Sequence, residues 1–153
     1  MHEIILGAAI SGLMGFVIAV PALVVEASRR RGEHLPIVSD IHILWGWKLN
    51  AREVFVASLF LHLAIATIVG GLYVWFAERG WLVITNAPYA LHSILIFTAL
   101  TWAVLGLIVF PILGMGFFAV REGKHVWFEM LVTHVLIAFG FWLAVMYYRP
   151  FFF

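Results

Sequence analysis

The chain contains no cysteine, and only 11% of its 153 residues are charged. The absence of cysteine excludes disulfides, thiolate metal sites, iron–sulfur clusters and cysteine nucleophiles. A soluble domain usually carries about 25% charged residues, so this chain has too few to form a water-compatible surface. The formal net charge of +1 gives no reason to expect nucleic acid as a partner. Any chemistry must use histidine, carboxylate or hydroxyl groups, or a bound cofactor.

Apolar residues make up 65% of the chain, and they gather in long runs without charge. Four such runs are predicted to be membrane spans, at residues 4–25, 54–76, 88–110 and 126–148. Each run is long enough to cross a hydrocarbon core of about 30 Å as a helix. The third run extends without charge to residue 120, which as one helix measures about 50 Å, so we expect a kink at Pro111.

Two further considerations define the fold class. Backbone groups inside lipid must be hydrogen-bonded within the protein, and the runs lack the alternating pattern of barrel strands. The sequence therefore predicts an all-α integral membrane protein, a bundle of four transmembrane helices that forms a single domain over residues 1–153.

The distribution of basic residues predicts an orientation. Seven of the nine lie in the first and third connections: Arg29, Arg30, Arg31, Lys48, Arg52, Arg121 and Lys124. Only Arg79 and Arg149 lie on the other side. By the positive-inside rule, both termini are expected on the non-cytoplasmic side. The four tyrosines are then expected in an aromatic belt at the outer interface: Tyr73, Tyr89, Tyr147 and Tyr148.

The long connection between the first two spans mixes apolar and polar residues over residues 36–50. This composition predicts a short segment lying in the inner membrane interface, with Trp45 and Trp47 as anchors. The segment is expected to be helical after a cap at Ser39 or Asp40. An ordered loop packed under the bundle is the alternative.

The two halves of the sequence resemble each other. Each half has a proline toward the inner end of its first span, followed by a basic segment. The second span of each half carries one histidine, and these residues, His62 and His134, follow Arg52 and Lys124 by ten residues. The pattern predicts two related helical hairpins, with a symmetry axis along the membrane normal.

Equal offsets from the basic residues place His62 and His134 at the same depth, about 15 Å from the inner interface. Two opposed imidazoles are the axial ligands that a b-type haem requires. Small residues beside His62, namely Ser58, Ala66 and Gly70, leave room for a macrocycle. The same spacing also promotes ordinary helix packing, and a histidine bonded to a backbone carbonyl to hold helix register is the alternative interpretation.

A second group of candidate ligands lies toward the outer side of the membrane. His2 stands near the N-terminus, and His92 begins the third span from that side. With Glu3 they are a candidate copper or zinc site, because imidazole and carboxylate suit these metals.

The third and fourth spans carry the run FPILGMGFF at residues 110–118, followed by His134 after a short basic turn. This part of the chain resembles small uncharacterised bacterial four-span membrane proteins. The resemblance implies the bacterial inner membrane as location and carries no activity. The opposed histidines resemble those of membrane b-type cytochromes and of the haem-anchoring subunits of respiratory complexes. The paired-histidine signatures of these families are incomplete in this sequence, which gives no basis for a second haem.

The segments outside the membrane are too short for a catalytic domain, while 14 phenylalanines and 7 tryptophans offer surfaces to partner helices. We therefore expect a small integral membrane subunit of a larger complex rather than an independent enzyme. The favoured assembly is a redox complex, with haem b at His62 and His134 and quinone as the redox partner. The alternatives are a cofactor-free structural or assembly subunit, and an oligomeric transporter of small solutes or metal ions.

Overall fold

The computed structural model describes residues 1–28, 42–81 and 87–152. Its α-helices are α1 (His2–Ser28), α2 (Ala51–Glu78), α3 (Leu91–Val104), α4 (Phe110–Ile112) and α5 (Val126–Phe152). A two-stranded antiparallel hairpin is formed by β1 (Ile43–Leu44) and β2 (Trp47–Lys48). A π-helical turn, Leu105–Val109, joins α3 to α4, and a 3₁₀ turn, Phe117–Ala119, precedes α5.

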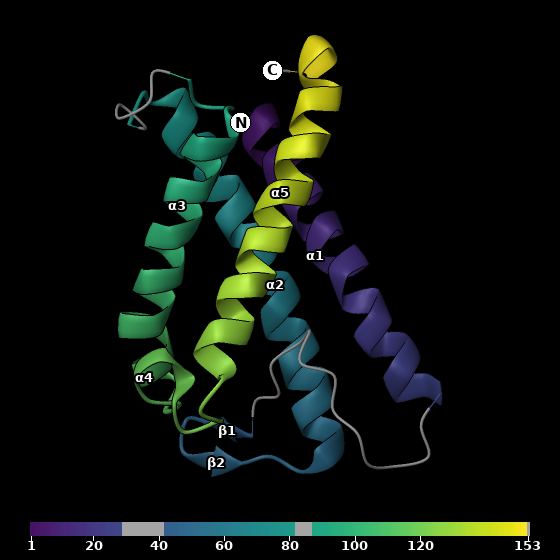
Figure 1. Cartoon of the computed structure of the whole chain (residues 1–153), viewed down its shortest axis with the longest axis vertical. Coiled ribbons are helices and arrows are strands. Elements are labelled where there is room, and N and C mark those ends of the chain that lie inside the picture. Colours follow the sequence, from purple (N-terminus) through teal and green to yellow (C-terminus); the bar gives the residue numbers. More distant parts are fainter. Residues whose placement is uncertain (29–41, 82–86, 153) are drawn as a thin grey trace.

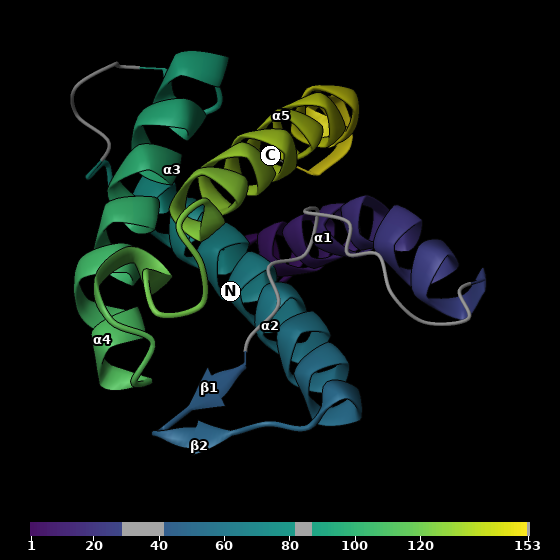
Figure 2. The same cartoon turned by 60° about the horizontal axis from the view of Figure 1, so that its bottom comes forward.

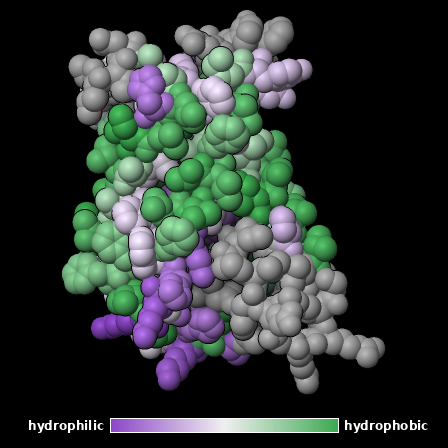
Figure 3. Space-filling view, in the orientation of Figure 1, coloured by the Kyte–Doolittle hydropathy of each residue, from purple (hydrophilic) through white to green (hydrophobic). Residues whose placement is uncertain are grey.

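Four helical segments are long and apolar enough to cross a membrane. They are His2–Pro21, Arg52–Glu78, Leu91–Ile112 and Val126–Tyr148. In three of these segments only 28% of the most apolar window is buried inside the protein, so the other side chains there are at least partly exposed at its surface. On the face seen in Figure 3, apolar side chains cover the middle of the molecule, and hydrophilic side chains are most concentrated at the end that holds the hairpin. The four apolar helices agree with the predicted fold class and indicate an integral membrane protein.

The closest helix pair is α1 with α2, and α5 contacts both α1 and α3. The N-terminus and the C-terminus lie at the same end of the molecule, and the β1–β2 hairpin lies at the opposite end (Figures 1 and 2). An even number of crossings requires this placement of the termini, as the four predicted spans imply.

The α1–α2 contact is built from small residues. A Cβ atom on Gly70 of α2 would collide with the side chain of Ser11 and lie 2.6 Å from the carbonyl oxygen of Gly7. One on Gly15 would lie 2.8 Å from the Cβ atom of Ala66. Two of the small residues around His62, Ala66 and Gly70, therefore take part in close packing against α1, the ordinary role of this spacing in membranes.

The third span ends earlier than the extension to residue 120 that the sequence suggested. The N–H of Phe110 donates to the carbonyl of Leu105, five residues back, just before Pro111, which has no N–H to donate. The helix then stops at Ile112, because the following glycines adopt left-handed backbone angles, with φ of 86° at Gly114 and 78° at Gly116. A widened turn and a helix end therefore replace the expected simple kink.

The described part of the segment 36–50, from His42 onward, is a hairpin and not the expected helix. Positive φ angles at Trp45 and Gly46 form its two-residue turn, a geometry that matches the twist of paired strands. The N–H of Trp45 donates to the carbonyl of Leu113 at 2.7 Å, which packs the hairpin beneath the third span. The alternative prediction, an ordered loop packed under the bundle, is thus closer to the observed structure. The predicted cap residues Ser39 and Asp40 lie outside the described residues.

Two clusters of buried hydrophobic side chains form the core. The outer cluster lies toward the termini and contains Ile10, Tyr73, Val74, Ile94, Phe97, Ala138, Phe141 and Val145. The inner cluster lies toward the hairpin and contains Leu105, Phe110, Met115, Ala119, Val126 and Met130. Both predicted histidines, His62 and His134, belong to neither cluster and lie along the helices between them.

Candidate intramembrane ligand site

A cavity of about 100 Å³ lies inside the bundle, flanked by α2 and α5. Most of its lining is apolar, and members of both hydrophobic clusters contribute to it. Its polar lining residues are Ser11, Ser58, His62, Tyr73, Thr98, Glu122, Thr133 and His134. A mainly apolar cavity with a few polar groups is the usual composition of a small-molecule site.

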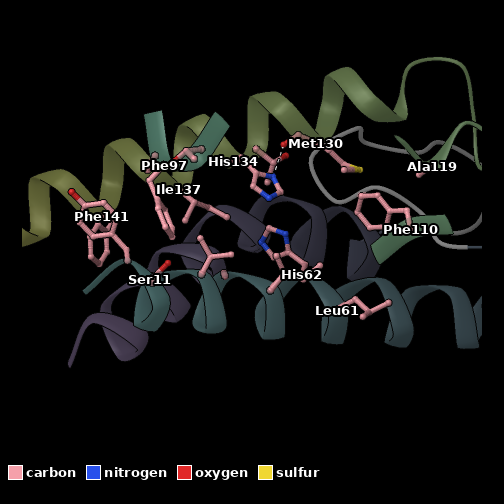
Figure 4. Close-up of a pocket in the computed structure, with 18 of the residues that line it drawn as sticks. Ser11, Leu61, His62, Phe97, Phe110, Ala119, Met130, His134, Ile137 and Phe141 are labelled. Carbon is pink, nitrogen blue, oxygen red and sulfur yellow. Dashed lines mark hydrogen bonds between the residues drawn. The ribbon is translucent and has the colours of Figure 1, made fainter. Parts of the chain in front are cut away.

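The structure brings the two predicted histidines to this one cavity. His62 comes from α2 and His134 from α5, and their imidazoles point toward each other across the space between the helices (Figure 4). Helices α2 and α5 run in the same direction, so the equal offsets in sequence place both side chains at one level. The juxtaposition that the sequence suggested is therefore present, whatever it serves.

His134 presents an unpaired nitrogen to the interior. Its Nδ1–H donates to the carbonyl oxygen of Met130, one turn earlier on α5, at 2.8 Å. Because a carbonyl only accepts, Nδ1 carries the hydrogen and Nε2 of the neutral ring carries a lone pair. Nε2 is buried and has no hydrogen-bond partner within the described residues. A buried polar atom without a partner is rare in native proteins and suggests a missing ligand or water.

His62 is held differently. Its Nε2–H donates to the carbonyl oxygen of Gly15 on α1 at 2.9 Å, so the imidazole bridges two helices. This carbonyl is accessible because Gly15 lets α1 approach α2 closely. The lone pair of the neutral His62 ring therefore lies on Nδ1. The bond matches the alternative in which a histidine fixes helix register.

Tyr73 is a site residue that the sequence placed in the wrong environment. It was expected at the outer interface, but only 2% of its surface is exposed, whereas Tyr147 is 73% exposed. Its ring is met edge-on by Phe97 and Phe141, with ring centroids 5.2 and 5.8 Å away. The Tyr73 hydroxyl is buried and has no hydrogen-bond partner in the part of the chain that the structure describes. Residues 62, 66, 70 and 73 share one face of α2. This spacing was the sequence signal that could have placed Tyr73 inside the bundle together with His62.

Glu122 is a second residue that sequence reasoning missed. Its side chain is only 1% exposed and lines the cavity. The carboxylate accepts the backbone N–H of His42 at 2.6 Å and that of Ile43 at 3.0 Å, and the His42 imidazole lies 3.2 Å away. The β1–β2 hairpin is thereby tied to the connection that leads into α5. No local pattern around Glu122 indicates this contact, because its partner lies about 80 residues earlier.

The outer metal site receives little support. His2 and His92 are both exposed, each near the first turn of its helix. Across residues 1–28, 42–81 and 87–152, no three His, Cys, Asp or Glu side chains gather closely enough to hold a metal ion. The set of His2, His92 and Glu3 is therefore not assembled in this structure.

Comparison of the chain with protein-family models, with curated proteins and with solved structures finds no match. At the level of the histidines the site offers a lone pair on His134, facing a second imidazole. Toward the termini it offers the hydroxyl of Tyr73, and toward the hairpin the carboxylate of Glu122.

Proposed function

We propose that this chain is a small integral membrane subunit of a redox complex and holds a b-type haem between His134 and His62. The observation that carries the proposal is the buried, unpartnered Nε2 of His134, which faces His62 across the cavity. Bound haem would supply one-electron transfer within the membrane.

The hydrogen bonding of His134 suits an axial ligand. Metal-ligating histidines usually donate their second ring N–H to a carbonyl or carboxylate, which fixes the tautomer and the ring orientation. The Nδ1–H of His134 makes such a bond to Met130, and Nε2 is left with a lone pair. No rearrangement of this side chain is required before it binds a metal.

His62 would have to exchange one partner for another. Ligation through Nε2 breaks its hydrogen bond to the Gly15 carbonyl, which is worth about 0.5–1.5 kcal/mol net. A whole macrocycle also needs more room than a cavity of about 100 Å³, so α2 and α5 must move apart to admit it. Because only His62 has to give up a hydrogen bond, His134 is the stronger ligand of the pair.

The hydrogen bond of His62 to Gly15 and the small volume of the cavity also favour a second candidate function, a cofactor-free structural or assembly subunit. In that role His62 ties α2 to α1 through Gly15, and no ligand needs to enter the bundle. Both candidates are consistent with the outward-facing apolar side chains, which can meet lipid or the helices of partner subunits.

An optical spectrum of the protein, purified in mild detergent from cells supplied with haem precursor, separates the two candidates. The haem proposal predicts a Soret band that His134→Ala abolishes and His62→Ala shifts or weakens. His92→Ala is the matched control, because that histidine is exposed and lies outside the cavity. Absence of the band in the unmodified protein would exclude the haem proposal.

Membership of a complex needs a separate measurement. Chains that co-purify in mild detergent should be stoichiometric with this protein and should contain a redox cofactor or a quinone-reactive subunit. A protein that remains alone and retains an electron-transfer activity of its own would contradict the subunit role.

A further inference from the structure

The end of the cavity near the termini has polar chemistry of its own, separate from the histidines. Tyr73 follows His62 by eleven residues on α2, which is about 16 Å along a helix axis. Tyr73 also belongs to the outer hydrophobic cluster, whereas the histidines do not. The outer end of the cavity is thus distinct from the level at which the two imidazoles meet.

The Tyr73 hydroxyl at this end is a donor without an acceptor. It is buried from solvent, and the residues described in the structure provide it with no hydrogen-bond partner. The rings packed against Tyr73 belong to Tyr89, Phe97 and Phe141. A largely apolar molecule that carries a hydrogen-bond acceptor matches these surroundings, because it packs against the rings and pairs with the hydroxyl.

We propose that the outer end of the cavity binds a lipid-soluble ring compound through a carbonyl oxygen, which accepts a hydrogen bond from the Tyr73 hydroxyl. The aromatic side chains of Phe97 and Phe141 provide the apolar walls against which such a ring packs. The whole cavity measures about 100 Å³, less than the roughly 150 Å³ of an engineered cavity that accepts benzene, so a ring compound has to widen it on binding.

The lipid-exposed surface of the bundle determines the source of such a ligand. Outward-facing apolar side chains surround the cavity-forming helices, so a compound dissolved in the membrane lies next to them. Quinones belong to this class of ring carbonyl compounds. The inference therefore supplies a partner for the proposed redox function, but binding at Tyr73 does not require haem.

A pair of ligands that differ only in the carbonyl tests the proposal. Acetophenone and ethylbenzene have nearly the same size and shape, and only acetophenone can accept a hydrogen bond. Equilibrium dialysis of the purified protein, with protein-free micelles as the blank, measures the preference as the ratio of the two association constants. Tyr73→Phe, which keeps the ring and its packing, should lower this preference about three- to tenfold, the value of one net hydrogen bond. Tyr147→Phe, at an exposed position, should leave the preference as it is in the unmodified protein.

Two outcomes would overturn the proposal: the same preference in Tyr73→Phe as in the unmodified protein, or a preference that only His134→Ala lowers. The last result would move the ligand to the histidine level. A protein that lacks a Soret band but keeps the Tyr73-dependent preference would lose the haem proposal and retain this one.

Discussion

The attachment of the β1–β2 hairpin to Glu122 leads to a prediction whose magnitude follows from the structure. Glu122→Ala removes the acceptor for two backbone N–H groups, at His42 and Ile43. A hydrogen bond to a charged group contributes about 1.5–3 kcal/mol. The N–H of His42 is exposed and water can replace its partner, whereas that of Ile43 is partly buried and loses more. The His42 imidazole is 54% exposed, so its ion pair adds only about 0–1 kcal/mol.

The free energy needed to open the hairpin should therefore fall by about 2–4 kcal/mol in Glu122→Ala. Opening exposes the amide of Ile43, so its hydrogen exchange should accelerate by roughly 30- to 700-fold. Hydrogen exchange followed by mass spectrometry or NMR in detergent measures this directly. In Glu122→Gln the exchange rate at Ile43 should lie between those of the unmodified protein and Glu122→Ala. The amide carbonyl oxygen still accepts one N–H, while the NH₂ group faces a second donor.

Glu78→Ala is the matched control, since Glu78 is an exposed carboxylate at the end of α2, away from the hairpin. Amides in the middle of α2 serve as the internal reference. If they accelerate as much as Ile43 does, the substitution has destabilised the whole bundle and the contact is not a local tie. Unchanged exchange at Ile43 in Glu122→Ala would refute the assigned role of the carboxylate.

Three further substitutions test the packing of the bundle, each by thermal unfolding in detergent. Gly70→Ala should destabilise the protein by about 1–3 kcal/mol, because its new methyl group meets Ser11 and a backbone carbonyl of α1. The control Ala99→Leu, on an exposed face, should change the stability little, and equal effects of the two substitutions would contradict the close crossing of α1 and α2. Tyr73→Phe should stabilise the ligand-free protein by about 1–3 kcal/mol, because it removes an unsatisfied buried hydroxyl, and a loss of stability would show that this hydroxyl is paired. His62→Ala should cost about 1–3 kcal/mol through the lost bond to the Gly15 carbonyl, and a neutral result would remove the case for His62 as a helix brace.

The four long helices could be predicted from the sequence because the bilayer imposes a simple physical condition. Every backbone polar group inside the hydrocarbon must be hydrogen-bonded, so a charge-free run of some 20 residues has to be a helix. The same reasoning placed His62 and His134 at one level, since helix rise converts residue offsets directly into depth. The end of the third span could not be predicted from hydropathy, because left-handed glycines at 114 and 116 stop the helix while the sequence remains apolar.

What only the tertiary structure decided concerns which side chains meet. Depth follows from residue number, but the face that a helix turns inward depends on how its neighbours pack. The small-residue stripe of α1 against Gly70 sets that rotation, which buries Tyr73 instead of leaving it at the interface. The tie between Glu122 and the hairpin joins residues about 80 positions apart and has no local signature. Composition and hydropathy therefore determined the helices and their levels, while the close packing of those helices determined the polar groups that line the cavity.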